Sequence, residues 1–125
     1  VLEYAAQCAP KQQLDTIFIG GGTPSTWPDH LLLDMFGTLE DVFVLSKDTE
    51  ISIEVNPGTV RPEQLQVWKQ AGINRLSIGV QGLKDSVLND LNRKQSSTDV
   101  FWVLDQASRL FSNISVDLIL GLPGV

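Results

Sequence analysis

Four short runs of apolar, mostly β-branched residues constrain the fold of this chain more than any other feature. They cover residues 16–20, 51–55, 75–80 and 116–121. Runs of this length and composition are typical of β-strands. Each interval between them has room for a crossover helix, and such connections join parallel strands. The sequence therefore predicts an α/β fold built from four consecutive βα units.

The segments between these runs carry helix start and stop signals. Pro28 suits a first helical turn, as does Pro62, and residues 96–98 (SST) offer several N-cap oxygens. Gly72 can end its helix in the left-handed conformation. Apolar stripes at spacings of three and four residues follow these signals: Leu65 and Trp68; Val87, Leu88 and Leu91; Val103, Leu104, Ala107 and Leu110. We expect these stripes to cover the sheet.

Side chains within the four runs alternate between an aliphatic set and a mixed, mostly polar set. The aliphatic set is Ile17, Ile19, Ile51, Ile53, Val55, Leu76, Ile78, Val80, Val116, Leu118 and Leu120. The mixed set is Thr16, Phe18, Ser52, Glu54, Ser77, Gly79, Gln81, Asp117, Ile119 and Gly121. A parallel sheet covered on both faces is apolar on both, whereas a barrel can hold polar groups and a ligand inside. The pattern therefore favours part of a TIM-like barrel with outer helices.

Composition limits the partners and the location. The formal net charge of −6 and the lack of a Lys or Arg cluster argue against nucleic acid and anionic lipid as partners. No apolar run approaches the ~18 residues that a membrane span needs. Cys8 is the single cysteine, so no internal disulfide can form and we expect the cytoplasm. Because Val1 is not an initiator methionine and the chain stops after a strong strand, we expect a fragment.

A glycine-rich loop and four polar residues are the candidates for a ligand site. Gly20, Gly21 and Gly22 follow the first strand and permit a close backbone approach to a ligand, although a bare turn explains them equally well. The loop lacks the Walker and dinucleotide-binding patterns. A carboxylate at Glu54, near the end of the second strand, needs a cationic or hydroxyl-bearing partner, which is Arg75 or Lys69 in a structural interpretation and a ligand in a functional one.

Three more polar residues belong to the same candidate site. Gln81 lies just past the third strand, Asp117 at the predicted start of the fourth, and Arg93 where it can face solvent or turn back over the mouth of a barrel. Singly, each is better explained by a structural role. Their convergence on one side of the sheet favours a binding site.

Five motifs in register resemble radical S-adenosylmethionine (SAM) proteins of the oxygen-independent coproporphyrinogen III oxidase and HemW heme chaperone group. They are IGGGTPS (19–25), IEVNPGT (53–59), GINRLSIGVQ (72–81), LNRKQS (91–96) and VDLILGLPG (116–124). The resemblance implies that SAM is lined by Gly21, Gly22, Thr23, Glu54, Gln81, Arg93 and Asp117. It further implies that residues 1–125 are a fragment of a radical SAM core domain, without the C-x-x-x-C-x-x-C segment that holds the 4Fe–4S cluster.

We therefore assign no catalytic residue and no metal ligand within this chain, and whether its parent is an enzyme stays open. Cys8 is interpreted as a packed thiol on a helix and His30 as a surface residue. The resemblance to HemW is the closer one, and it implies a heme chaperone with heme or a porphyrin as ligand and a heme acceptor or electron donor as partner. The alternatives are a coproporphyrinogen III oxidase, which decarboxylates propionate side chains oxidatively, and a nucleotide-binding α/β domain that holds phosphate on the glycine loop.

Overall fold

The computed structural model of the chain describes residues 11–121. Its strands are β1 (Gln13–Ile19), β2 (Val44–Val55), β3 (Arg75–Gln81) and β4 (Asn113–Leu118). Its helices are α2 (Asp29–Val42), α3 (Gln64–Gln70), α4 (Asp85–Asp90) and α5 (Ser97–Leu110), with 3-10 turns η1 (Pro24–Thr26) and η2 (Pro57–Thr59). The helix predicted around Cys8 lies outside the described residues. Within residues 11–121 no helix is long and apolar enough to cross a bilayer.

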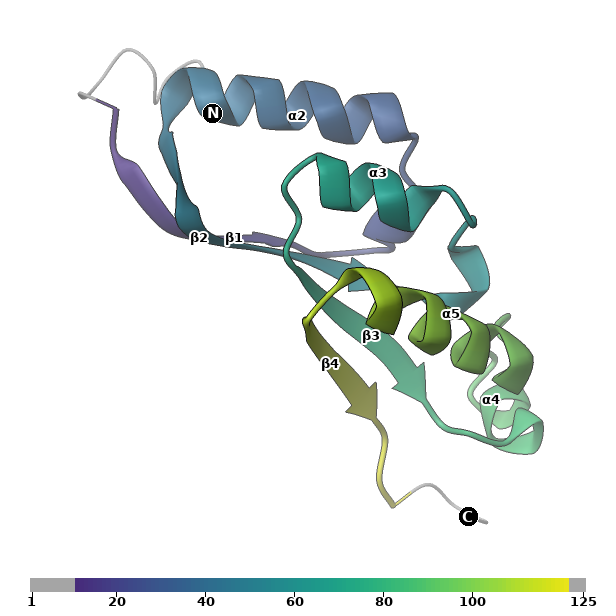
Figure 1. Ribbon diagram of the computed structural model, residues 1–125. Helices are drawn as coiled ribbons and strands as arrows, with labels where there is room; N and C mark the ends of the chain where they lie inside the picture. The colour runs from purple at the N-terminus through teal and green to yellow at the C-terminus, as the bar shows by residue number, and fades with distance from the viewer. Residues whose placement is uncertain (1–10, 122–125) are drawn as a thin grey trace.

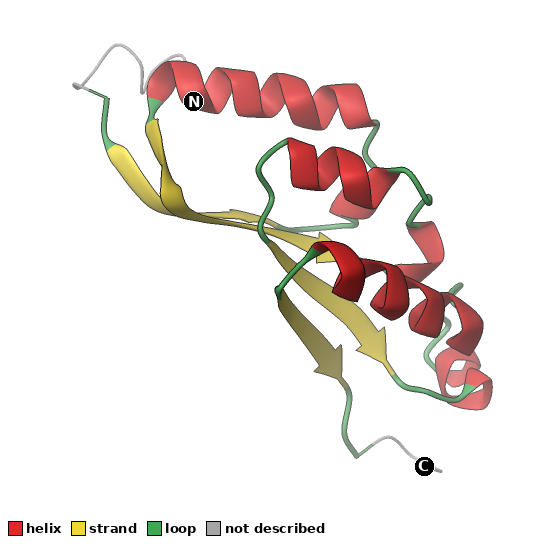
Figure 2. Cartoon of the chain, in the orientation of Figure 1, coloured by secondary structure: helices red, strands yellow, loops and turns green. Residues whose placement is uncertain are grey.

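The four strands form one parallel sheet in the order β1-β2-β3-β4 (Figure 1). Helices α2, α3 and α5 lie on one face of this sheet, and α4 lies beyond the end of β3, as Figure 2 shows. Sequential order with one-sided covering is the arrangement of a barrel segment, whereas a doubly wound sheet has helices on both faces. The predicted α/β architecture is therefore confirmed.

The core lies between the sheet and its helices, and the aliphatic set of strand residues supplies the sheet side. Ile53, Leu76 and Ile78 are fully buried. From the helices, the buried partners are Leu32, Phe36, Leu65, Trp68, Val100, Val103 and Ala107. Burying such side chains contributes about 1.5–3 kcal/mol each relative to exposure. This layer fixes the register of β1, β2 and β3, and hence which side chains face the opposite side.

The aliphatic face of β4 is more exposed than that of the other three strands. Val116 and Leu118 are 47% and 54% exposed, and Leu120 is 89% exposed. In β1 to β3 the corresponding side chains lie under α2, α3 or α5, whereas no described helix follows β4 to cover this face. Among the described residues, the aliphatic face of the fourth strand is therefore not covered.

Strand bounds also differ from the predicted ones. β2 begins at Val44, seven positions before the predicted Ile51, and β4 spans Asn113–Leu118 instead of 116–121. The early part of β2 contains Lys47 and Asp48, which interrupt the apolar pattern that predicts a strand. The hydroxyl of Thr49 donates to the carbonyl of Leu14 on β1 (2.8 Å). Pairing with β1 thus extends β2 where composition does not predict it.

The predicted helix signals are largely confirmed. Ser96 caps α5 in a capping box with Asp99, and Gly72 ends α3 with φ +97°. α3 starts at Gln64, after the first turn expected at Pro62 and Glu63. His30 is exposed on α2, as expected.

Candidate ligand pocket at the carboxyl ends of the strands

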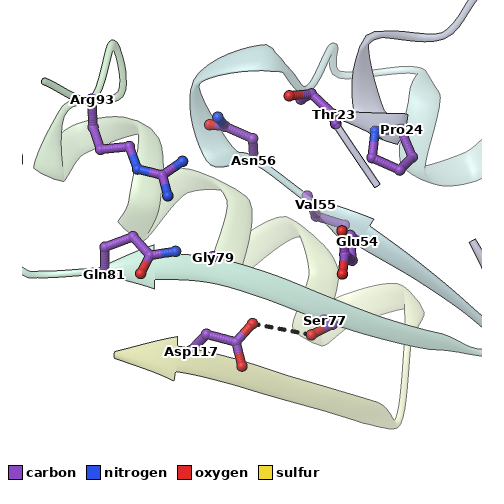
Figure 3. A pocket seen from close by; sticks show the side chains of 11 residues that line it. Thr23, Pro24, Glu54, Val55, Asn56, Ser77, Gly79, Gln81, Arg93 and Asp117 are labelled. Carbon is purple, nitrogen blue, oxygen red and sulfur yellow. Dashed lines mark hydrogen bonds between the residues drawn. The ribbon is translucent and has the colours of Figure 1, made fainter. Parts of the chain in front are cut away.

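An open pocket of about 210 Å³ lies where the carboxyl ends of β1 to β4 meet. It is lined by Gly22, Thr23, Pro24, Glu54, Val55, Asn56, Ser77, Gly79, Gln81, Arg93 and Asp117. Figure 3 shows these side chains converging from the ends of β2, β3 and β4, from the loop after β1 and from the segment after α4. Parallel α/β sheets bind ligands at this end, because the loops that follow the strands gather there.

The glycine loop after β1 is fitted closely to Glu54. Gly21 and Gly22 have φ +89° and +61°, which favour glycine. The N–H of Gly21 donates to Oε2 of Glu54 (3.1 Å). A Cβ at Gly20 would stand 3.1 Å from the carboxyl carbon of Glu54. The bare-turn interpretation is therefore incomplete, because this loop also orients a carboxylate.

Glu54 does not form the ion pair that the structural interpretation expected. Arg75 pairs with Glu50 instead (Nη1 to Oε1, 2.9 Å), and this hydrogen bond lowers the pKa of Glu50. Lys69 lies over the ring of Phe111, with Nζ 5.3 Å from the centroid. Among residues 11–121, Glu54 has no salt-bridge partner. Its half-buried carboxylate is left with one backbone N–H and free capacity to accept from a ligand.

A buried polar network joins the loop after β1 to the loop after β2. The hydroxyl of Ser25, a fully buried residue, lies 2.7 Å from the Thr59 hydroxyl and accepts from the N–H of Asn56 (3.1 Å). The side-chain amide of Gln64 donates to the carbonyl of Ser25 (3.0 Å) and accepts from the N–H of Arg61 (3.2 Å). This network fixes the loop that contains Ser25 against the loop that contains Asn56, and both loops contribute residues to the pocket.

Gln81 closes β3 in an unusual backbone conformation. Its φ is +65°, and the N–H of Gly82 donates to the carbonyl of Val80 (2.7 Å), which makes a γ-turn centred on Gln81. The register with β4 shifts between Gly79 and Gln81, as in a β-bulge. A Cβ at Gly79 would stand 3.0 Å from Nε2 of Gln81. Such turns cost about 1–3 kcal/mol and persist at functional sites.

Asp117 lies near the carboxyl end of β4, which corrects its predicted place at the start of that strand. The pairing of Arg75 with Asn113 begins β4 three positions earlier than predicted, so Asp117 lies opposite Gly79. Its Oδ2 accepts from the hydroxyl of Ser77 (3.2 Å), as Figure 3 shows. The correction moves Asp117 to the end of the sheet where the pocket lies.

Arg93 supplies the positive charge of the pocket. It follows Asn92, which has φ +52°, and its N–H donates to the carbonyl of Leu88 (2.9 Å). Its exposed side chain has no salt-bridge partner among the described residues. Figure 3 shows its guanidinium and the carboxylate of Glu54 on different sides of the pocket. Arg93 is thus exposed to solvent and also lines the pocket, so the two options left open by the sequence do not exclude each other.

Six of the seven predicted site residues line this pocket, and the seventh, Gly21, contacts Glu54 through its N–H. The sequence did not single out Ser77, Gly79 or Asn56 as site residues. Alternation within β3 gave a signal for the first two, because both share the face of Gln81.

The fold and the pocket define a segment of an α/β barrel with a ligand site at the carboxyl ends of its strands. The sequence profile of the Radical SAM superfamily matches residues 1–125, and the chain belongs to this superfamily. Membership implies SAM and a 4Fe–4S cluster as cofactors.

Individual relatives agree with this assignment. The chain is 42% identical over 113 residues to "Heme chaperone HemW" of Bacillus subtilis, covering 89% of this chain and 30% of the relative. It is 38% identical over 118 residues to "Oxygen-independent coproporphyrinogen III oxidase" of Synechocystis, covering 94% and 25%. The solved structure of coproporphyrinogen III oxidase (HemN) from Escherichia coli, titled a radical SAM enzyme, matches with a TM-score of 0.89 at 32% identity, covering 99% and 29%. The chain thus spans about a third or less of the length of these relatives.

The residues present fit one of the two implied cofactors. Two carboxylates, two amides and a guanidinium suit a ligand that carries an amine, hydroxyls and a carboxylate, as SAM does. Three thiolate ligands for a cluster do not occur among these residues, because the chain has one cysteine, Cys8, which lies outside the described part. Residues 11–121 also contain no group of three His, Cys, Asp or Glu side chains placed to hold a metal.

Proposed function

We propose that the pocket binds SAM. The observation that carries this proposal is the set of pocket charges that have no ion-pair partner among residues 11–121: the carboxylates of Glu54 and Asp117 and the guanidinium of Arg93. Glu54 is half-buried, where a charge is normally paired, whereas Asp117 and Arg93 are exposed and line the same pocket. Charges of both signs around one pocket favour a ligand with complementary charges. SAM carries an ammonium, a sulfonium and a carboxylate in one molecule.

Each lining residue has a role that its chemistry suits. Arg93 would bind the carboxylate of SAM through paired N–H donors, and Glu54 would accept from its ammonium or its ribose hydroxyls. Asp117 and the amide of Gln81 would supply further hydrogen bonds to the ribose or adenine. Gly21, Gly22 and Thr23 would let the backbone approach the methionyl end. When bound, SAM supplies a sulfonium whose carbon–sulfur bond can be cleaved reductively.

We further propose that the whole protein is a HemW-type heme chaperone located in the cytoplasm. The support is the 42% identity to HemW of Bacillus subtilis and the resemblance of the motif at 56–59 (NPGT) to HemW chaperones. Heme is then a ligand and a heme acceptor the partner. The second candidate is an oxygen-independent coproporphyrinogen III oxidase, which the Synechocystis relative and the Escherichia coli structure favour.

Isothermal titration of SAM into the full-length, cluster-loaded protein tests the binding site. We expect saturable binding of SAM and no comparable binding of ATP, which the phosphate-binding alternative would bind in preference. Anaerobic incubation with coproporphyrinogen III then separates the two whole-protein functions. Heme binding without formation of protoporphyrinogen supports the chaperone, and product formation supports the oxidase.

A further inference from the structure

Gln95 is a buried glutamine that touches the end of β3 from outside the strand. It is 3% exposed, and its Nε2 donates to the carbonyls of Gly79 (3.0 Å) and Val80 (2.9 Å). Its Oε1 is buried and has no hydrogen-bond partner among the described residues. A buried oxygen without a hydrogen bond lowers stability. The role of this amide therefore lies in the two hydrogen bonds that it donates.

The two carbonyls that Gln95 binds come directly before Gln81. This is the segment where the register slips by one residue and where the γ-turn gives Gln81 its φ of +65°. A non-glycine residue persists in this conformation only when its surroundings impose it. The two N–H donors of the Gln95 amide bind the two carbonyls that precede the turn and so restrain it.

Gln95 is itself held on both sides. A Cβ at Gly58 would stand 3.0 Å from the Cα of Gln95, so η2 packs directly against its backbone. The next residue, Ser96, is the N-cap of α5 and forms a capping box with Asp99. Gln95 therefore has little freedom to move, and its hydrogen bonds restrain the end of β3.

We propose that Gln95 is a positioning residue for the ligand pocket. Its amide holds the turn at Gln81 in the conformation that directs the Gln81 side chain into the pocket, where Figure 3 shows it. The inference rests on the proposed binding of SAM. It assigns Gln95 no contact with the ligand, so its effect on affinity passes through Gln81.

The test compares Gln95→Met with a matched control in the full-length, cluster-loaded protein. Methionine keeps the length of the side chain and removes both donors. The control is Asn74→Leu, because the Asn74 amide also binds the backbone of a neighbouring strand, donating to Thr49 (2.8 Å) and accepting from Ile51 (2.9 Å), but at the amino end of β3 and outside the pocket. We expect Gln95→Met to weaken SAM binding about 10-fold by titration and Asn74→Leu to change it less than 2-fold, although both lower the melting temperature.

A double-mutant cycle with Gln81→Ala separates positioning from general destabilisation. If Gln95 acts through Gln81, Gln95→Met costs less than 2-fold in affinity once Gln81 is alanine. A full 10-fold loss in that background, or no loss in the single variant, overturns the inference. Should Gln95→Met not fold, Gln95→Asn keeps the amide but is too short to reach both carbonyls, and the same cycle applies. A wild-type protein that binds no SAM instead overturns the proposed function itself.

Discussion

Glu54 and Arg75 lie on adjacent strands but do not form an ion pair. At the scale of single residues, strand register determines which carboxylate an arginine can reach. The pairing of β2 with β3 puts Ser52 opposite Arg75, so Glu50 and Glu54 lie two positions away from Ser52 in opposite directions. Arg75 binds Glu50, towards the amino ends. The sequence predicted Glu54 as a site residue, but it gave no way to tell which of two equivalent carboxylates the arginine neutralises.

The first prediction concerns the charge of Glu54. Glu54→Gln keeps an oxygen that can accept from Gly21 but removes the negative charge that the proposed SAM ammonium or ribose would use. We expect SAM binding to weaken by about 1–3 kcal/mol, the range for a charge-assisted hydrogen bond. Titration of the full-length, cluster-loaded variant measures the loss. Glu50→Gln is the control, because it neutralises a carboxylate on the same strand outside the pocket. Equal affinity in wild type and Glu54→Gln would remove Glu54 from the site.

The second prediction concerns pH. The hydrogen bond from Arg75 holds the pKa of Glu50 below its ordinary value of 4.5. A carboxyl group whose pKa is lowered by folding stabilises the protein above its unfolded-state pKa, and this contribution disappears as pH falls through the folded-state pKa. Between about pH 5 and 3, wild type should therefore lose stability more steeply than Arg75→Met. Melting temperatures recorded across this range test the difference, and parallel curves would contradict it.

At the scale of elements, substitution by alanine should change stability in opposite directions at two glycines, Gly58 and Gly37, each of which precedes a threonine. In Gly58→Ala on η2, the new Cβ would meet the backbone of Gln95 at 3.0–3.2 Å, and a backbone cannot move aside cheaply. We expect a loss of about 1–3 kcal/mol, as for overpacking. Gly37 lies inside α2, is exposed, and has no neighbour within 4 Å of an added Cβ. Gly37→Ala should gain about 0.5–1 kcal/mol from helix propensity. Urea denaturation measures both; a gain at Gly58 would refute the close packing.

Element ends that depend on nearby residues could be predicted, whereas those that depend on distant strands could not. Ser96 and Gly72 act through local geometry, so both ends were placed correctly. The start of β2 could not be predicted, because Lys47 and Asp48 interrupt its apolar pattern and its pairing depends on β1, more than 30 residues away, as in the hydrogen bond from Thr49 to Leu14. The same error at β4 misplaced Asp117. Strand limits set by distant partners are not encoded in local composition.

At the scale of the whole molecule, the candidate site exists because four strands end together. The alternation of polar and aliphatic residues predicted a shared polar face, and the parallel register brings Glu54, Ser77 and Asp117 onto it. Periodicity could not predict the γ-turn at Gln81, which coincides with a register shift between β3 and β4, or the hydrogen bonds from Gln95, which join segments about 15 residues apart. The sequence thus predicted which residues line the pocket and missed the contacts that hold them there.

A ligand that contacts all four strand ends must protect segments that are far apart in the chain. If SAM binds as proposed, deuterium exchange in the full-length, cluster-loaded protein should slow together at residues 20–24, 54–58, 79–82 and 116–119. Opening any one of these segments then costs ligand contacts, so binding stabilises all of them against local unfolding. A nucleotide held by its phosphates on the glycine loop would protect residues 20–24 alone. Exchange measured by mass spectrometry with saturating SAM, with ATP and without ligand distinguishes the two, and protection confined to the loop in the presence of SAM would contradict a pocket that spans the sheet.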